Sequence, residues 1–365
     1  MKPVVAFVTV VPSPYQRDLF HALSRRPELS LEVFYLEAST PDSPWPRANL
    51  EENEAVLPGF CLSARGIRCH INWALPDISR YDLVVLNTMM SATGQWLARH
   101  CTKKGVPWIF YGERLRDRAP GWRTSIRDAW FAPVRRAAAI AAIGTVASAD
   151  YARRFPHVRR FCVPYYTDLR PFMESPSRTA GTELVFLFCG QMIRRKGVDV
   201  LLDAFSRLVD SSPGTSLRLL LVGREADLAE MLAPLSPLAR SRVTYEGFQD
   251  PKRLPDYFAR ADVFVLPSRY DGWGVVVNQA LGAGLPIICS TTVGAAHDLV
   301  EDEVNGLKTA PGDAPMLAEA MARFVHQRDL APRWGAASRA KAEDWLPERG
   351  AAKWVEAIAT VLDRA

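Results

Sequence analysis

The sequence predicts an α/β fold that consists of two doubly wound, Rossmann-like domains. Three observations lead to this prediction. The chain has 365 residues, and because a domain averages about 150 residues, this length favours two domains. Short apolar runs with the length of buried parallel strands alternate with helical patterns. This alternation stops at the polar segment 174–181 and then begins again.

The first half of the chain contains several apolar runs that we interpret as buried strands. They lie at 4–11, 31–36, 83–86, 108–111 and 139–143. Helices are predicted at 16–25, 95–104 and 146–155. The Pro-rich segment 41–58 is predicted to be a long loop, and loops of this length are usually functional. Because doubly wound sheets bind ligands beyond the carboxyl ends of their strands, we expect binding residues directly after these runs.

The second half repeats the pattern after a segment that we interpret as a linker. Its predicted strands lie at 184–189, 217–222, 243–246, 263–266 and 287–289. A last helical pattern, 348–362, follows Pro347. The expected division of the chain is a first domain at 1–165, a linker at 166–181, a second domain at 182–345 and a terminal helix at 346–365.

The composition argues against several classes of protein. Hydrophobic residues make up 48% of the chain, which is enough for two cores. The longest apolar stretches, such as 137–144, are far shorter than the roughly 18 to 20 residues of a membrane span. The first apolar run ends at Pro12 and lacks the layout of a signal peptide, so we expect a cytoplasmic protein. The six cysteines form no C-x-x-C pair, and we interpret them as reduced thiols rather than disulfides or metal ligands.

Seven arginines gather in the segment 114–136, within a chain of formal net charge +5. Its arginines, interleaved with Trp122, Trp130 and Phe131, suit an anionic membrane surface or an anionic acceptor. Membrane contact would place the protein peripherally on the inner face of the membrane. The alternative is a solvated helix face with its aromatic residues in the core. Nucleic acid is not expected as a partner, because no recognised nucleic-acid module accompanies the segment. The arginines are Arg114, Arg116, Arg118, Arg123, Arg127, Arg135 and Arg136.

The segment 268–286 combines the features of an anion-binding turn. It follows the apolar run 263–266, contains Gly272 and Gly274, and continues into a helical pattern that ends at Gly284. Glycines let the backbone come close to a ligand. The free amides at a helix N-terminus favour an anionic group. The sequence therefore predicts a strand, a glycine turn and a helix that together bind an anion.

Asp271 and Gln279 flank this turn, at most roughly 12 Å apart along a helix axis. The stretch resembles the donor-site signature of the retaining nucleotide-sugar glycosyltransferases of family 4, in which an acidic residue, seven other residues and a glutamate flank the turn. Gln279 stands where the family has that glutamate. The resemblance implies the GT-B architecture, in which the two Rossmann-like domains face each other across a cleft. It implies donor contacts at Gly272, Trp273, Gly274 and Gln279. It also implies that Asp271 holds hydroxyls of the transferred sugar.

The segment 190–197 resembles the family's second donor element, a glycine loop followed by basic residues and Lys-Gly. Lys196 and Arg195 offer charged hydrogen-bond donors to a diphosphate. Gln191 stands where the family usually has an arginine. The resemblance further implies that the turns after the next two strands contact the donor, the second of them beside the nucleotide base. The donor-contact residues implied by these loops are Gly190, Gln191, Gly223, Gly247 and Phe248.

The first half resembles the family only in its layout. The family often has a histidine that contacts the donor sugar at about the position of 111–113, where this chain has Glu113. Glu113 is either a replacement hydrogen-bonding group or part of a structural salt bridge to Arg114 or Arg116. In the family the terminal helix commonly returns to the first domain.

The resemblance leads to the hypothesis of a retaining, metal-independent glycosyltransferase. It would move a hexose-type sugar from a nucleotide diphosphate donor, such as a UDP-sugar or a GDP-sugar, to a hydroxyl of a glycan, lipid-linked or small-molecule acceptor. The first domain would bind the acceptor. Lys196, Arg195, Asp271 and Glu113 would be catalytic, and we expect no cofactor and no metal, because the chain has no Asp-x-Asp motif. The alternatives are a catalytically impaired or engineered inactive protein, because Gln279 replaces the usual glutamate, and a sugar-nucleotide epimerase.

Overall fold

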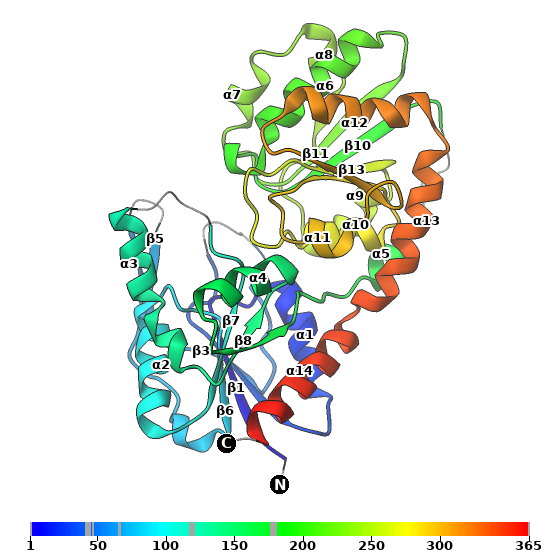
Figure 1. The fold of residues 1–365 in the computed structure, drawn as a ribbon. Helices are drawn as coiled ribbons and strands as arrows, with labels where there is room; N and C mark the ends of the chain where they lie inside the picture. Colours follow the sequence, from blue (N-terminus) through cyan, green and yellow to red (C-terminus); the bar gives the residue numbers. More distant parts are fainter. Residues whose placement is uncertain are drawn as a thin grey trace. The chain divides into compact units, whose positions relative to one another are not determined.

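The structure is a computed structural model that describes residues 2–40, 45, 47–64, 67–116, 121–175 and 181–363. The side chains of Ala64, Ile67 and Arg123 are outside this description. The chain divides into two compact units (Figure 1). The first unit comprises Met1–Thr167 together with Pro347–Ala365, and the second comprises Asp168–Leu346. Each unit contains a parallel sheet covered by helices, which confirms the predicted α/β class.

The described part of the first unit contains a seven-stranded parallel sheet. In spatial order its strands are β3 (Glu54–Val56), β2 (Ser30–Tyr35), β1 (Val4–Thr9), β6 (Leu83–Leu86), β7 (Trp108–Gly112), β8 (Ala139–Ala142) and β9 (Arg159–Cys162). Its helices are α1 (Pro14–Ser24), α2 (Ala92–Lys104), α3 (Trp122–Trp130) and α4 (Thr145–Arg154), with the 3-10 turns η1 (Ile78–Arg80) and η2 (Ala132–Arg136). Figure 1 shows α1 and α2 on opposite sides of this sheet.

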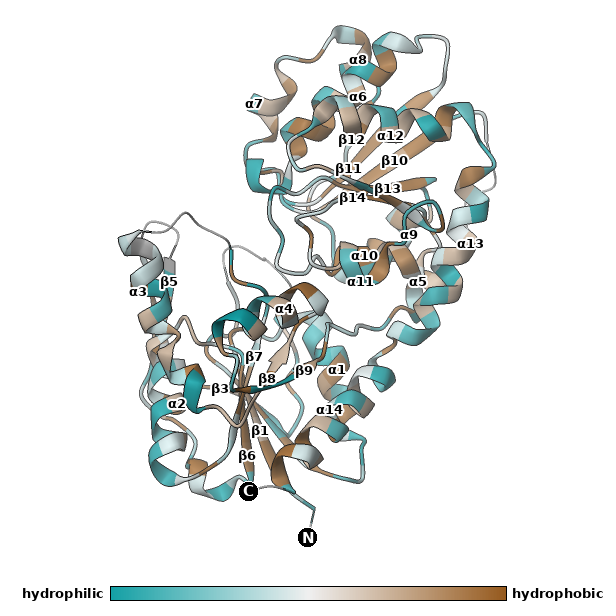
Figure 2. Ribbon diagram, viewed as in Figure 1, coloured by the Kyte–Doolittle hydropathy of each residue, from teal (hydrophilic) through white to brown (hydrophobic). Residues whose placement is uncertain are grey.

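The central strands are the most apolar part of the first unit. Strands β6, β7 and β8 are buried along their whole length, and Figure 2 shows the strands in brown, the colour of hydrophobic residues. A parallel sheet with helices on both faces requires such continuous apolar strands. The sequence identified these strands because their composition alone distinguishes them.

The chain between β2 and β6 differs from the predicted long loop at 41–58. Within the predicted loop, residues Glu54–Val56 form the edge strand β3. A separate antiparallel hairpin follows, made of β4 (Gly59–Ala64) and β5 (Ile67–Asn72). These strands are only partly buried, so they lack the continuous apolar run by which the other strands were recognised. Residues 41–44 and 46 lie outside the described residues.

The described part of the second unit contains a six-stranded parallel sheet. In spatial order its strands are β12 (Val243–Tyr245), β11 (Leu217–Val222), β10 (Leu184–Cys189), β13 (Val263–Leu266), β14 (Ile287–Ser290) and β15 (Gly306–Thr309). Figure 1 shows α6 (Val198–Ser211) and α12 (Ala314–His326) on one side of the sheet, and α10 (Val276–Gly282) and α11 (Ala296–Leu299) on the other. The remaining helices are α5 (Arg170–Glu174), α7 (Leu228–Leu232), α8 (Pro237–Ser241), α9 (Leu254–Phe258) and α13 (Leu330–Ala342), with the 3-10 turns η3 (Arg194–Lys196), η4 (Pro251–Arg253) and η5 (Glu343–Trp345).

The segment interpreted as a linker, 166–181, is divided between the two units. Residues 166 and 167 group with the first unit, whereas α5 groups with the second. Phe172 of α5 is buried and its ring contacts that of Phe258, with 5.3 Å between the centroids. Burial of this apolar side chain fixes α5 on the second unit. Residues 176–180 lie outside the described residues.

The last helix, α14 (Pro347–Leu362), follows the second unit in sequence but belongs to the first. It packs against α1. Its fully buried Trp354 lies with its ring centroid 4.8 Å from that of Phe7 and 5.0 Å from that of Tyr111. The first unit is therefore assembled from both ends of the chain. Among the described helices, none has the length and apolar composition of a membrane span.

Candidate functional site

The strand order of the second sheet reverses between β10 and β13. Doubly wound sheets bind ligands at such a switch point, beyond the carboxyl ends of the strands. The two segments singled out in the sequence, 190–197 and 268–286, follow β10 and β13 directly. The structure therefore brings them to the same edge of the sheet.

Three glycines follow neighbouring strands at this edge. Gly190 directly follows β10, Gly223 directly follows β11, and Gly247 lies just beyond β12. The amide of Gly223 donates to the carbonyl of Gly247 at 2.8 Å. Gly223 has φ +139°, and a Cβ built on it would overlap the carbonyl of Gly190. The turns after β10 and β11 are in direct backbone contact, and for this reason only glycine fits at this position. Phe248, next to Gly247, is exposed.

The loop after β10 is held against the end of β13 by a second close approach. Gly197 has φ +72°, and a Cβ on it would overlap the carbonyl of Pro267. The loop also turns on itself, because the amide of Lys196 donates to the carbonyl of Ile193 at 2.9 Å. The carbonyl of Gln191 accepts from the amide of Ile193, also at 2.9 Å. Lys196 is thereby placed beside the residues that follow β13.

Lys196 and Asp271 form an ion pair, with 2.5 Å between Nζ and Oδ2. Their side chains are 15% and 13% exposed, respectively. Arg195 contacts the same loop, because its Nη1 donates to the carbonyl of Tyr270 at 3.1 Å. Its carbonyl accepts from the amide of Arg269 at 2.9 Å. Three of the four residues predicted to be catalytic are therefore neighbours, although Lys196 and Asp271 are 75 positions apart.

A salt bridge that the sequence analysis did not select braces these loops. Arg269 donates to both carboxylate oxygens of Asp199, at 2.6 and 2.9 Å, and to the carbonyl of Arg194 at 2.7 Å. Burial disfavours the ionised carboxyl of Asp199, but the hydrogen bond and the charge of Arg269 outweigh it and lower the pKa of Asp199. No sequence motif indicated this pair, because two exposed charges far apart in a chain are common without contact.

The turn after β13 runs beside the segment that follows β14. Asp271 and Val293 form a parallel bridge, and the amide of Ala295 donates to the carbonyl of Trp273 at 2.9 Å. The side chain of Trp273 is fully buried and donates to Oδ1 of Asn278 at 2.9 Å. Only the backbone of Trp273 therefore faces the turn. Within the described chain, the amides of 272–275 donate to no backbone carbonyl, as is usual for the first amides of a helix.

Helix α10 follows this turn and carries Gln279. The helix ends at Gly282 rather than at the predicted Gly284, which instead adopts the left-handed conformation with φ +67°. The side-chain oxygen Oε1 of Gln279 is buried and has no hydrogen-bond partner among the described residues. A buried amide oxygen without a partner is costly, and such groups in native proteins call for an explanation such as a ligand or a bound water.

Glu113 belongs to the first unit, directly after β7. Its backbone carbonyl accepts from the hydroxyl of Tyr151 at 2.5 Å. Its side chain is hydrogen-bonded to Tyr165, and burial followed by the charge of Glu113 raises the pKa of Tyr165 well above its usual value. This hydrogen bond ties Glu113 to the aromatic cluster of Tyr165 and Tyr15, whose ring centroids lie 5.1 Å apart.

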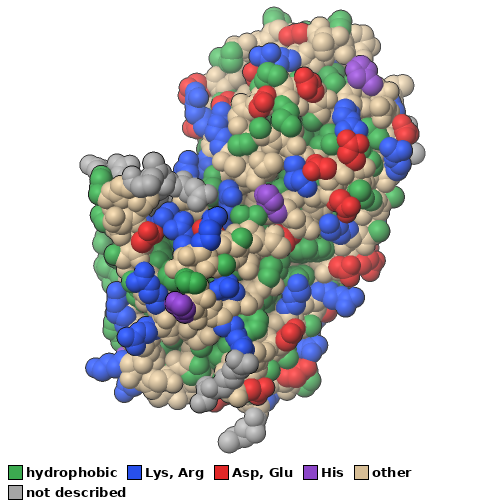
Figure 3. Space-filling model, in the orientation of Figure 1, with side chains coloured by type: hydrophobic (Ala, Val, Ile, Leu, Met, Phe, Trp, Pro, Cys, Tyr) green, Lys and Arg blue, Asp and Glu red, His purple; other side chains and the backbone are tan. Residues whose placement is uncertain are grey.

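The basic segment 114–136 contains α3 and η2. Trp122, Ile126 and Trp130 of α3 are exposed, with Trp122 at 69%. Arg135 and Arg136 are also exposed, whereas Arg127 is largely buried and donates to the carbonyl of Arg116. On the face of the first unit drawn in Figure 3, Lys and Arg side chains (blue) lie among hydrophobic ones (green). Arg118 and the side chain of Arg123 lie outside the described residues.

Comparisons with known proteins show what this chain resembles. Residues 183–327 match the family model described as Glycosyl transferases group 1. The α-D-kanosaminyltransferase of Streptomyces kanamyceticus is 23% identical over 261 residues, which cover 70% of this chain and 60% of that protein. Other curated relatives match over smaller shares of their length, down to 36% for an uncharacterised glycosyltransferase of Methanocaldococcus jannaschii. The chain thus spans less than two thirds of these relatives.

Solved structures resemble the whole chain. Sucrose-phosphate synthase from Thermosynechococcus elongatus superposes with a TM-score of 0.77 at 19% identity, covering 100% of both chains. The Anabaena protein HepE, solved in complex with UDP and glucose, superposes with a TM-score of 0.72 at 16% identity, covering 97% of this chain and 99% of that one. These similarities establish the fold. The chain therefore has the two-domain GT-B fold, and residues 183–327 of its second unit match the model of the group 1 glycosyltransferases.

Proposed function

We propose that this protein is a retaining, metal-independent glycosyltransferase. It transfers a hexose-type sugar from a nucleotide diphosphate donor to a hydroxyl group of a glycan, lipid-linked or small-molecule acceptor. The observation that carries the proposal is the Lys196–Asp271 pair, which lies between glycine turns at the switch point of a group 1 glycosyltransferase domain. The UDP bound to HepE, which shares the fold, supports a nucleotide donor.

The proposed chemistry depends on charge at the leaving group. The bond between the anomeric carbon and the diphosphate oxygen breaks, the acceptor hydroxyl oxygen bonds to that carbon on the same face, and the hydroxyl proton passes to a phosphate oxygen. Lys196, Arg195 and the amides of 272–275 stabilise the negative charge that develops on the diphosphate. Together they supply the positive charge that a metal ion provides in other transferases. Asp271 holds hydroxyls of the transferred sugar.

The residues proposed for the remaining donor contacts lie at the same edge of the sheet. The turns at Gly190 and Gly223 let the nucleotide approach the backbone, and the exposed Phe248 beside Gly247 offers an apolar surface to the base. The unpartnered oxygen of Gln279 accepts a hydrogen bond from a ribose hydroxyl, which satisfies it. The acceptor binds the first unit. Glu113, which belongs to the same unit, takes the place of the family's histidine as a hydrogen-bonding group for the donor sugar.

We also propose that the first unit docks on an anionic membrane surface from which a lipid-linked acceptor is drawn. The exposed Trp122 and Ile126 beside exposed arginines of η2 support this proposal. Aromatic and basic side chains on one surface bind anionic interfaces by combining apolar burial with electrostatic attraction.

A product analysis tests the proposed function. The full-length chain is incubated with labelled UDP-sugars and GDP-sugars and with glycan, small-molecule and lipid-linked acceptors, with and without a chelator. We expect a new glycoside whose anomeric configuration, determined by NMR, matches that of the donor, at a rate that the chelator does not change. Conversion of the donor sugar without transfer would instead indicate an epimerase, and nucleotide binding without turnover a catalytically impaired protein.

A further inference from the structure

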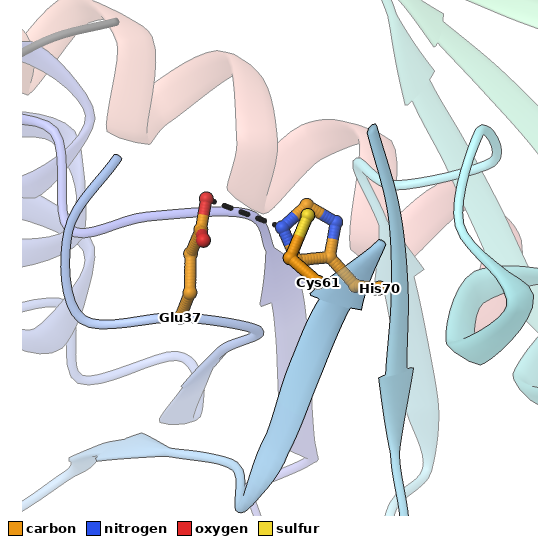
Figure 4. A group of neighbouring side chains, drawn as sticks. All are labelled: Glu37, Cys61 and His70. Carbon is orange, nitrogen blue, oxygen red and sulfur yellow. Dashed lines mark ion pairs between the residues drawn. The ribbon is translucent and has the colours of Figure 1, made fainter. Parts of the chain in front are cut away.

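Three metal-ligating side chains meet in the first unit, outside the proposed donor site. Glu37 follows β2, Cys61 lies on β4 and His70 lies on β5. Cys61 and His70 are paired directly across the β4–β5 hairpin and share one of its faces. One ligand atom from each of the three residues lies within 4.8 Å of the other two. Figure 4 shows the Glu37 carboxylate turned toward the His70 ring, with Cys61 beside that ring.

The ring nitrogen of His70 is the least satisfied atom of this cluster. His70 is 3% exposed. Its Nε2 lies 3.2 Å from Oε1 of Glu37, but the contact is not directed as a hydrogen bond, and Nε2 has no hydrogen-bond partner among the described residues. A buried imidazole nitrogen without a partner is costly, and a neutral one is a common metal ligand. A metal ion bound to Nε2 would satisfy this nitrogen.

Arg68 orients the carboxylate of Glu37. Its Nη2 donates to Oε2 of Glu37 at 2.6 Å and to Oε1 at 2.9 Å, and its Nη1 donates to Oγ1 of Thr40 at 2.6 Å. The shorter bond fixes Oε2, and Oε1 is the oxygen that faces His70. Hydrogen bonds of this kind, which orient a ligating carboxylate from behind, are typical of metal sites.

We propose that Glu37, Cys61 and His70 bind a Zn²⁺ ion through Oε1, Sγ and Nε2. Thiolate, imidazole and carboxylate are the three ligand types of protein zinc sites, and a water completes a tetrahedral set. Bonds of about 2.0 to 2.3 Å hold tetrahedral ligand atoms roughly 3.5 Å apart. Closing the site therefore requires a movement of about 1 Å. The two anionic ligands offset the charge of the ion beside Arg68.

The bound ion joins the hairpin to the main sheet. Strands β4 and β5 pair only with each other in the described residues. They are held to the rest of the unit by side chains such as Arg68, which donates to Glu37, and Asn72, which donates to the carbonyls of Leu36 and Leu57. A bond from Cys61 and His70 to Glu37, at the end of β2, fixes the hairpin through an ion that contributes folding free energy. The role proposed for the ion is to hold the hairpin, and it takes no part in the proposed donor chemistry.

Cobalt spectroscopy of the full-length chain tests the proposal, because Co²⁺ bound to a thiolate gives a charge-transfer absorption. We expect this absorption to saturate at about one Co²⁺ per chain and to disappear when Zn²⁺ is added. Zn²⁺ should also raise the melting temperature. Cys61→Ser and His70→Gln should each weaken metal binding by at least about 10-fold to 100-fold. Losses of that size are typical when only an outer hydrogen-bond partner of a metal ligand is removed. Binding should weaken as the pH is lowered, because the thiol and the imidazole must lose their protons.

Cys69→Ser is the matched control, because Cys69 neighbours His70 on β5 and its side chain points to the opposite face of the hairpin. It should keep the absorption and the zinc-dependent melting temperature. Circular dichroism checks that each variant is folded. If a variant is unfolded, Cys61→Ala is tested in its place. An absent absorption in the wild type, or an equal loss in Cys69→Ser and Cys61→Ser, would overturn the proposal and leave an ion pair of His70 with Glu37.

Discussion

Lys196 and Asp271 show how a single pair of residues sets the electrostatics of the proposed donor site. Their side chains are mostly buried, and Nζ of Lys196 lies 2.5 Å from Oδ2 of Asp271. A diphosphate that arrives at this edge competes with Asp271 for Lys196. In the proposed mechanism, Lys196 accelerates the reaction because it stabilises the negative charge that the diphosphate gains as its bond to the sugar breaks.

We therefore expect Lys196→Ala to lower kcat by about a hundredfold, comparable to the loss of one preorganised oxyanion donor, while donor binding changes less. Steady-state kinetics measures both. Arg194→Ala is the control, because Arg194 is an exposed cation in the same loop and contacts Glu230 at 3.5 Å. Full activity of Lys196→Ala would remove Lys196 from the mechanism.

Gln279 is the second residue-scale test. A glutamate at this position accepts ribose hydrogen bonds with charge assistance, whereas the buried amide oxygen accepts them as a neutral group. A charged hydrogen bond exceeds a neutral one by roughly 1 kcal/mol, so Gln279→Glu should tighten nucleotide diphosphate binding by about fivefold, less the repulsion between the new anion and the diphosphate. Calorimetry measures the affinity. Gln327→Glu, an exposed change at the end of α12, should have no effect. Weaker binding by Gln279→Glu would show that the ribose lies elsewhere.

At the scale of elements, the Arg269–Asp199 salt bridge joins the start of α6 to the loop after β13. Because the pKa of Asp199 is lowered in the folded protein, its ionised form contributes stability above the pKa of an unfolded aspartate, about 3.9. That contribution is lost as the pH falls through the lower, folded-state value. Asp199→Asn should therefore be less stable than the wild type near neutral pH, and the difference should shrink below about pH 4.

Denaturant titrations of both proteins across this pH range measure the difference. Asp203→Asn is the control, because Asp203 lies on the same helix and pairs with Arg207 at an exposed site. Exposed pairs on a helix contribute little. A pH-independent difference between Asp199→Asn and the wild type would contradict the role assigned to ionised Asp199.

Helix α3 is the element that tests membrane docking. We expect the full-length chain to float with vesicles of anionic lipid and to stay unbound with neutral vesicles, because each basic residue near an anionic surface contributes about 1 kcal/mol. A Trp122→Ala, Ile126→Ala double variant should float less. Leu238→Ala, an exposed apolar change in the second unit, serves as the control. Equal flotation with both vesicle types would leave α3 with only a structural role.

At the scale of the whole molecule, the return of α14 means that the end of the chain completes the first unit. Trp354 fills the core between Phe7 and Tyr111, and its replacement by alanine should cost about 3 to 5 kcal/mol. Hydrogen exchange should show the loss of protection in β1 and α1, not in β10 to β15. Glu356→Ala, an exposed change on the same helix, should be near neutral. Equal loss of protection in both sheets would mean that the two units unfold together.

Most elements of the fold followed from local patterns in the sequence. Strands such as β6, β10 and β13 are continuous apolar runs, because a parallel strand that is buried on both faces carries apolar residues along its whole length. The hairpin β4–β5 was missed because its strands are partly exposed and carry polar residues such as His70. The proposed donor residues were found through glycine and charge spacing, yet the burial of Trp273 could not be read from that spacing.

The sequence by itself determined the α/β class, the buried central strands and the glycine turns, because periodicity and backbone sterics act between residues close in the chain. The tertiary structure alone decided which charges meet. Lys196 finds Asp271, Arg269 finds Asp199, and Glu37 finds His70 only after the strands have paired. The same holds for α14, whose apolar face would fit many cores and is assigned to the first unit by Phe7 and Tyr111. Such contacts join residues far apart in sequence, and burial against a specific partner, rather than any local preference, selects them.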